Sequence, residues 1–256
     1  MALLRIRFYA ELNDFLTPKR RQVEFSLPFA PGAAIKDVIE SCNVPHTEVD
    51  LIIVNGRSVD FAYQPQEGDR VSVYPVFESV DITPLVRLRP KPLRETKFAL
   101  DAHLGKLAGL LRLLGFDTLY RNDWRDDELA RVSHDERRIL LTRDRGVLKR
   151  SRVTHGYYVR ADDPRRQAME VVHRFDLRGQ IAPYTRCMRC NGLLHPVAKA
   201  DVIDRLEPLT RLYYDTFHQC ASCGQVYWPG SHFEPLRRFV DEITSGSAEN
   251  ATPAPG

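Results

Sequence analysis

The second half of the chain carries two pairs of cysteines with the spacing of a metal site. Cys187 and Cys190 form one Cys-x-x-Cys pair, and Cys220 and Cys223 form the other. Four thiolates at bond lengths of about 2.3 Å complete the tetrahedral shell that Zn²⁺ prefers, so this pattern predicts a closed, structural zinc site. A redox dithiol or an iron–sulfur cluster is the alternative. The segment between the pairs exceeds the usual ~15–20 residues, which predicts an insertion with its own helix.

A second set of candidate ligands consists of aspartates that follow short apolar runs. "KFALD" ends at Asp101, and "ILLTRD" ends at Asp144. If both runs are parallel strands, their carboxyl ends meet at one edge of the sheet, and the two acids become neighbours. Carboxylates this close repel one another, and a divalent cation relieves that repulsion.

The stretch from Lys97 to Asp144 has the pattern strand, helix, strand, helix, strand. Leucines three and four positions apart, from Leu104 to Leu114, form one apolar helical stripe that ends at Gly115. "DTLY" predicts a strand, and "DDELARVSHDERR" predicts a polar-faced helix. Helices between short strands imply parallel pairing with right-handed crossovers. No Gly-x-Gly-x-x-Gly or Walker-type loop occurs, which disfavours a dinucleotide or triphosphate cofactor.

Helix capping offers a simpler explanation for each aspartate. Asp101, Asp126, Asp144 and Asp163 each stand where an N-cap of a predicted helix belongs. Aspartate is among the best N-caps, worth about 1 kcal/mol. Taken singly, each residue is better explained as a cap, whereas the predicted convergence favours metal binding. One side chain can serve both purposes.

The charge is unevenly distributed along a chain whose formal net charge is +3. Residues 81–180 carry 22 Lys and Arg against 15 Asp and Glu, whereas residues 1–80 carry 8 against 11. A basic surround with an acidic centre suits a polyanion that is held by its phosphates and cut at metal ions. An arginine-rich solvated surface is the alternative.

Residues 1–80 predict a small β-grasp domain, with a strand hairpin, a helix and further strands. "VNGRSVDFAYQPQEGDRVSVYPVF" resembles the ubiquitin-like sulfur-carrier proteins of molybdopterin and thiamine synthesis. Those carriers end in a Gly-Gly tail, whereas this chain continues without one. The difference argues against sulfur transfer and favours docking of a protein partner.

The remaining boundaries follow from composition. Residues 81–96 are rich in proline and arginine and predict a linker, residues 97–180 an α/β domain, residues 181–240 the cysteine-containing domain, and residues 241–256 a disordered tail. No apolar run approaches the roughly 20 residues that cross a bilayer, and the N-terminus has no signal-peptide layout. These features predict a cytoplasmic protein.

The segment from "KFALDAHLGKLAGLLRLLGFDTLY" to "ILLTRDRGVLKR", followed by the cysteine pairs and "YWPGSH", resembles the Mut-seven C-terminal RNase family. That family is a PIN-like nuclease domain with an appended zinc ribbon, and bacterial members carry a similar ubiquitin-like unit. The resemblance implies an α+β β-grasp domain, an α/β PIN-like parallel-sheet domain and a C-terminal zinc ribbon.

The resemblance also implies a metal-dependent ribonuclease. Asp101 and Asp144 would bind the Mg²⁺ or Mn²⁺, Asp126 is the third acid, and Asp162 or Asp163 is a fourth. The arginines expected to hold phosphate are Arg143, Arg145 and Arg112, with ordinary surface charge as the alternative. Two other functions remain open: a non-catalytic RNA-binding module, and a protein-interaction adaptor built on the ubiquitin-like unit.

Overall fold

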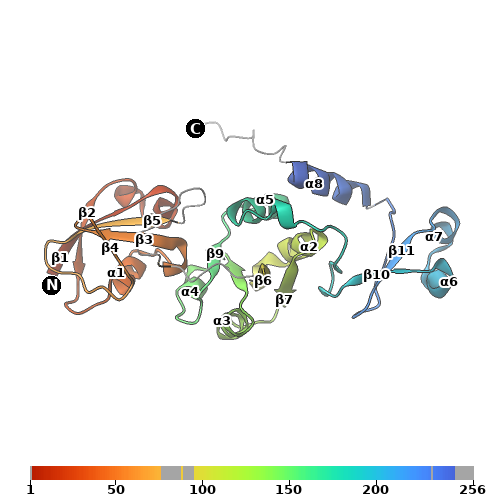
Figure 1. Cartoon of the computed structure of the whole chain (residues 1–256), viewed down its shortest axis with the longest axis horizontal. Coiled ribbons are helices and arrows are strands. Elements are labelled where there is room, and N and C mark those ends of the chain that lie inside the picture. Colours follow the sequence, from red (N-terminus) through yellow and green to blue (C-terminus); the bar gives the residue numbers. More distant parts are fainter. Residues whose placement is uncertain (1, 76–87, 89–94, 232, 246–256) are drawn as a thin grey trace. The chain divides into compact units, whose positions relative to one another are not determined.

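The computed structural model describes residues 2–75, 88, 95–231 and 233–245 (Figure 1). The chain divides into two compact units. The first combines Met1–His103 with Asp123–Tyr158, and the second combines Leu104–Asn122 with Val159–Gly256. Most of the predicted linker at 81–96 and most of the predicted tail lie outside the described residues.

The N-terminal part of the first unit is a five-stranded sheet in the order β2-β1-β5-β3-β4. Its strands are β1 (Ala2–Phe8), β2 (Phe25–Phe29), β3 (Val49–Val54), β4 (Arg57–Val59) and β5 (Arg70–Pro75). β1 and β2 pair antiparallel, β1 and β5 pair parallel, and helix α1 (Ile35–Ser41) packs its buried Ile35 and Ile39 into the core. The predicted β-grasp arrangement is confirmed.

A parallel sheet forms the rest of the first unit. Strands β6 (Lys97–Leu100), β8 (Ile139–Thr142) and β9 (Gly156–Tyr158) pair with Leu100 opposite Leu141 and Leu141 opposite Tyr157. Every residue of β8 is buried, as expected of a strand covered on both faces. Helix α3 (Asp126–Asp135) contacts β6 and β8, and helix α4 (Arg145–Leu148) follows β8. The predicted parallel pairing of β6 with β8 is confirmed.

The second unit begins with helix α2 (Gly105–Leu113) and strand β7 (Asp117–Tyr120) and continues with helix α5 (Pro164–Arg174), which packs against α2. The leucine stripe is buried as predicted: Leu107, Leu111 and Leu114 have no exposed surface. Gly115 ends the helix at a φ of +96°, where a Cβ would lie 2.3 Å from the carbonyl oxygen of Ala182. Both the backbone conformation and the close approach therefore require glycine.

The C-terminal part of this unit is a three-stranded antiparallel sheet in the order β10-β11-β12. Its strands are β10 (Leu194–Val197), β11 (Phe217–Cys220) and β12 (Val226–Tyr227). Helices α6 (Lys199–Val202) and α7 (Pro208–Tyr213) lie between β10 and β11, so the predicted helical insertion is confirmed. Helix α8 (Phe233–Ser245) follows the sheet.

Short 3₁₀ helices connect several of these elements, at Ala10–Phe15, Pro18–Arg20, His46–Glu48, Ala102–Leu104, Arg178–Gln180 and Ile203–Arg205. Within the described residues, none of the helices combines the length and the apolar character that crossing a membrane would require.

Replacing Gly115 by alanine should lower the free energy of unfolding by more than about 1 kcal/mol, because the new Cβ meets the Ala182 carbonyl at a left-handed φ. Thermal denaturation measures the effect. The matched control is Gly179→Ala, where a Cβ meets nothing within 4 Å. Equal melting temperatures for the two variants would contradict this account of the α2 terminus.

Candidate active site and metal centre

Two of the predicted acids meet at the carboxyl ends of β6 and β8. Asp101 follows β6, and its N–H donates to the carbonyl oxygen of Leu141 in β8 at 3.1 Å. The buried hydroxyl of Thr142 donates to Asp101 Oδ2 at 2.6 Å and accepts from the Asp144 N–H at 2.9 Å. The predicted convergence of Asp101 and Asp144 at one sheet edge is confirmed, and their chemical role stays a prediction.

Each of these carboxylates keeps one oxygen for further interactions. Asp101 is half-buried and Asp144 is exposed. Asp144 Oδ1 accepts from the Gly146 N–H at 2.6 Å, which makes Asp144 the N-cap of α4. Within the described part of the chain, Asp101 Oδ1 and Asp144 Oδ2 have no hydrogen-bond partner. These two oxygens are of the type that Mg²⁺ and Mn²⁺ prefer.

The other predicted acids are arranged differently. Asp163 is the N-cap of α5, since its Oδ1 accepts from the N–H groups of Arg165 and Arg166 at 3.0 Å each. Asp126 is the first residue of α3 and not its cap, which is Arg125, so the capping prediction was wrong there. The Asp126 carboxylate accepts from Arg150 at 3.2 Å.

The described residues contain one group of three or more histidine, cysteine or acidic side chains close enough to share an ion, and it is the cysteine group. The structure therefore brings together two of the predicted acids and not a third. Asp162 is exposed next to Asp163 in the second unit.

Arg112 does not face solvent as a phosphate ligand would. It is 4% exposed, and its guanidinium donates to the carbonyl oxygens of Thr118, Met188 and Arg189 at 2.9, 3.1 and 3.0 Å. Burial lowers its pKa from the ordinary arginine value. This placement contradicts the expectation that Arg112 holds RNA phosphate, because peptide carbonyls enclose the guanidinium.

Arg145 is also used within the protein. Its guanidinium lies 5.1 Å from the ring centroid of Phe15 and 5.5 Å from that of Tyr158, and it donates to the Phe15 carbonyl oxygen at 3.3 Å. Lys149, at the end of α4, donates to the Glu40 carbonyl oxygen at 2.8 Å. These contacts hold Arg145 against the ubiquitin-like domain, and its phosphate-binding role stays a prediction. Arg143 is half-buried, and its predicted role remains untested.

Sequence reasoning missed two residues at this site. Thr142 links the acids, and its one signal is a hydroxyl at the end of a buried strand. Glu48 is fully buried, and its carboxylate accepts from the Tyr158 N–H at 2.7 Å. Glu48 and Tyr158 are 110 positions apart, so no local pattern could have indicated this contact.

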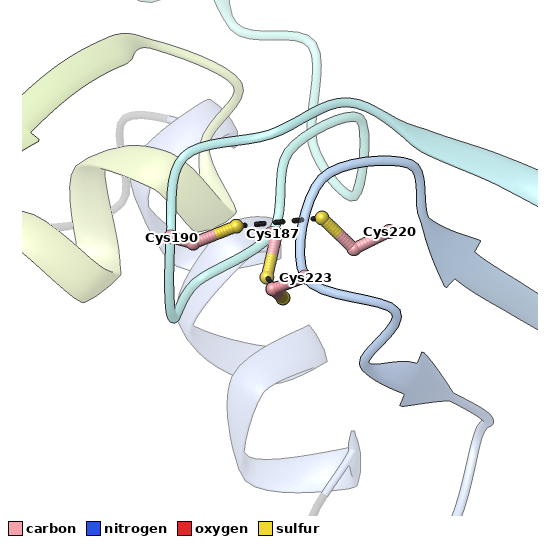
Figure 2. Close-up of side chains that lie close together, drawn as sticks. All are labelled: Cys187, Cys190, Cys220 and Cys223. Carbon is pink, nitrogen blue, oxygen red and sulfur yellow. Dashed lines mark hydrogen bonds between the residues drawn. The ribbon is translucent and has the colours of Figure 1, made fainter.

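The four cysteines form a second candidate centre, in the second unit. Figure 2 shows their side chains converging from two loops, residues 187–192 (the first cysteine loop) and 220–225 (the second cysteine loop). The four sulfurs lie within 4.8 Å of one another, with Cys187 and Cys223 at 3.7 Å and Cys190 and Cys220 at 3.4 Å. A tetrahedral zinc site with bonds of about 2.3 Å has sulfur–sulfur separations of about 3.8 Å. The four thiols therefore fit a structural metal such as zinc.

Backbone geometry explains why these loops present their sulfurs together. The N–H of Asn191 donates to the Cys187 carbonyl oxygen, and the N–H of Gly224 donates to that of Cys220, at 2.9 and 3.0 Å. Both turn residues have positive φ, as such turns require. A Cβ on Gly192 would lie 2.5 Å from the Ser222 hydroxyl and 2.8 Å from the sulfur of Cys220, so glycine lets the two loops approach without displacing these side chains.

The first cysteine loop is fixed to the α2–β7 segment. Asn191 donates to Asp117 Oδ1 at 2.8 Å and accepts from the Thr118 N–H at 2.9 Å, and Arg112 binds two carbonyls of the loop.

The thiols of the four cysteines have different acidities. Burial raises the pKa of Cys190 to about 12; at Cys220 burial also raises the pKa, but N–H donors from Cys223 and Ser222 outweigh it and leave a pKa of about 7.

Residues 96–240 match the model of the Mut7-C RNAse domain, and residues 1–81 match that of the Mut7-C ubiquitin domain. The chain belongs to the Mut7-C RNAse domain family. The family supports a nuclease-like role for this Mut7-C protein and a ubiquitin-like domain at its N-terminus.

No curated protein matches this Mut7-C chain. One similar solved structure is described as "Putative molybdopterin converting factor, subunit 1" from Pyrococcus furiosus. It is 22% identical, covers 29% of this chain and 98% of its own, and has a TM-score of 0.24.

The purified protein should contain about one zinc per chain by elemental analysis. Cys187→Ser and Cys220→Ser should each lose the metal and lower the melting temperature, because metal binding contributes directly to folding free energy. Zinc affinity should fall as the pH falls, since protons compete for the thiolates. Cys42→Ala, at a buried cysteine of the ubiquitin-like domain, is the control and should retain the metal. Full metal content in the serine variants would contradict the assignment.

Arg112→Met should destabilise the protein by roughly 2–5 kcal/mol, because one buried and two partly buried carbonyls lose a charged donor. At a temperature where the variant stays folded, the salt dependence of its RNA affinity should match that of the wild type, because no phosphate contact is lost. Chemical denaturation and RNA titration at several salt concentrations measure the two effects. A stable variant with a shallower salt dependence would restore the phosphate-binding role.

Proposed function

We propose that this Mut7-C protein is a metal-dependent ribonuclease that hydrolyses RNA phosphodiester bonds, with Asp101 and Asp144 as ligands of Mg²⁺ or Mn²⁺. The observation that carries the proposal is the shared hydroxyl of Thr142, which holds both acids at one sheet edge. Membership of an RNAse domain family supports the choice of RNA as the substrate class.

A divalent ion at such a site supplies charge that stabilises a scissile phosphate and lowers the pKa of a bound water. The protein supplies orientation. Thr142 fixes Asp101 through Oδ2, and the Gly146 N–H fixes Asp144 through Oδ1, so the partner-free oxygen of each carboxylate has a defined direction. Because the ligands are already oriented, little conformational entropy is lost when an ion binds.

The remaining residues have supporting roles in this proposal. Asp126 would join the site only by releasing Arg150. Asp163, whose Oδ1 caps α5, keeps its predicted role as a fourth acid. Asp162 is retained as an alternative to Asp163. Arg143, adjacent to Asp144, is the arginine proposed to hold the phosphate.

The cysteine domain, residues 181–240, is proposed to be a zinc ribbon that braces the nuclease domain, residues 97–180. The ubiquitin-like domain, residues 1–80, is proposed to recruit a protein partner. Its contacts with Arg145 and Lys149 suggest a second contribution, which is to support α4 behind Asp144.

A non-catalytic RNA-binding module is the alternative function, and one observation favours it. Asp144 and Asp163 both act as N-caps, which is sufficient structural reason for an aspartate at each position.

Asp101→Asn and Asp144→Asn separate the two functions. Asparagine caps about as well as aspartate, so the Asp144 variant should keep its stability within about 0.5 kcal/mol. RNA cleavage in Mg²⁺ or Mn²⁺ should fall by roughly 100-fold or more in either variant, because each loses an anionic ligand. Gel assays on a labelled RNA measure cleavage, and calorimetry measures stability.

Asp135→Asn, at the exposed end of α3, is the matched control and should cleave as the wild type does. If both site variants cleave normally, and the preparations are free of contaminating nuclease, the two acids are not the metal ligands.

A further inference from the structure

A groove of about 700 Å³ lies within the second unit, between the start of α2, the start of α5 and the first cysteine loop. Its walls include Lys106 and Leu110 of α2, Arg165 of α5, Met188 and Arg189 of the loop, and Tyr227 of β12. Of the acids proposed for the catalytic metal, Asp163 lines the groove, whereas Asp101, Asp126 and Asp144 do not, and neither do the four cysteines. The groove is therefore distinct from the Asp101–Asp144 pair and from the cysteine centre.

Two cations in this groove lack a counter-charge. Lys106 and Arg189 are exposed, and within the described residues their side chains have no hydrogen bond or ion pair. Other arginines of this unit already have partners. Arg165 donates to the Pro235 carbonyl oxygen, and Nη2 of Arg186 lies 3.8 Å from Oδ2 of Asp117. A cation that is already paired or buried attracts an added anion less strongly than an unpaired, exposed one. Lys106 and Arg189 are of the second kind and are therefore available to bind an anion.

The carboxylate that lines the groove does not cancel this charge. Asp163 directs Oδ1 to the N–H groups of Arg165 and Arg166 as the cap of α5. With three cationic side chains and one carboxylate in the lining, the groove carries a net positive charge. Its electrostatics thus favour a polyanionic ligand.

The lining of the groove between the cations is largely apolar. Gly105 and Gly109 lie four positions apart on α2 and leave that face of the helix without side chains, and Leu110, Met188 and Tyr227 complete the lining. Unpaired bases stack on aromatic and apolar side chains, whereas a duplex keeps its base faces covered. The combination of apolar surface and unpaired cations is complementary to a single strand.

We propose that this groove binds single-stranded RNA, with Lys106 and Arg189 against phosphates and with bases on Met188 and Tyr227. The proposal deepens the ribonuclease function, on which it rests, by naming a path for the substrate. It also gives the cysteine centre a purpose. Arg112 and the cysteines fix the backbone of the first cysteine loop, which carries Met188 and Arg189. The cysteine centre would thus hold these two RNA-binding residues in place.

The test is a Lys106→Gln, Arg189→Gln double variant of the full chain. Binding of a labelled oligo(U) strand is measured by fluorescence polarisation over a range of salt concentrations, without added Mg²⁺ or Mn²⁺ and without a chelator. Two lost phosphate contacts should make the plot of log K against log salt shallower by about 1.4, because each contact to a single strand contributes about 0.7. Affinity at low salt should fall roughly tenfold.

The matched control is Arg238→Gln, which removes a cation that is 76% exposed on α8 and does not line the groove. It should leave both slope and affinity unchanged. Zinc content and melting temperature, measured on every variant, exclude a folding defect. A Met188→Ala variant should weaken binding severalfold without changing the slope, since it removes stacking surface and no charge.

The outcomes distinguish the groove from the nuclease function. If the double variant binds RNA as the wild type does while the wild type cleaves RNA, the groove proposal is overturned and the nuclease proposal is retained. If the double variant loses RNA binding while the wild type does not cleave RNA, the groove proposal is retained and the nuclease proposal is overturned. Equal losses for a duplex and a single strand would overturn the preference for unpaired bases.

Discussion

One buried hydroxyl determines the geometry on which the proposed chemistry depends. The Thr142 side chain can donate one hydrogen bond and accept others, and it uses both capacities, toward Asp101 and toward the Asp144 backbone. The parallel register of β6 and β8 makes this possible, because Leu100 pairs with Leu141 and the next residue of each strand must then be adjacent. A one-residue slip would turn the hydroxyl to the other face of the sheet.

A comparable constraint operates in the second unit, where buried polar contacts attach the first cysteine loop to α2 and β7. Arg112 donates to carbonyl groups of β7 and of the loop, and the side chain of Asn191 accepts from the Thr118 N–H; neither contact involves a cysteine sulfur. Such fully satisfied networks specify one arrangement, because any alternative leaves a buried charge or amide unpaired. These contacts thus hold the loop independently of any metal that the cysteines would bind.

The sequence predicted those features that arise from periodicity and spacing. The leucine stripe, the alternation in β1, the cysteine pairs and the aspartates that follow β6 and β8 are all local patterns, and each corresponds to the structure. The sequence could not predict the contacts of side chains whose partners are remote along the chain. Arg112 binds carbonyls 76 and 77 positions away, and Arg145 binds one 130 positions away. The N-cap prediction for Asp126 was wrong for a different reason: the N-cap of α3 is Arg125, and sequence rules do not favour arginine as a cap.

The buried carboxylate of Glu48 has a consequence for how the molecule meets other chains. Strand β9 lies at the edge of its sheet, and an open edge offers free N–H groups on which a foreign strand can add. Glu48 occupies the Tyr158 N–H, and Phe15 packs edge-on against the Tyr158 ring at 5.4 Å. Through these two contacts the ubiquitin-like domain disfavours the addition of a foreign strand to β9. A protein partner of this domain would therefore bind a surface other than the one that carries Phe15 and Glu48.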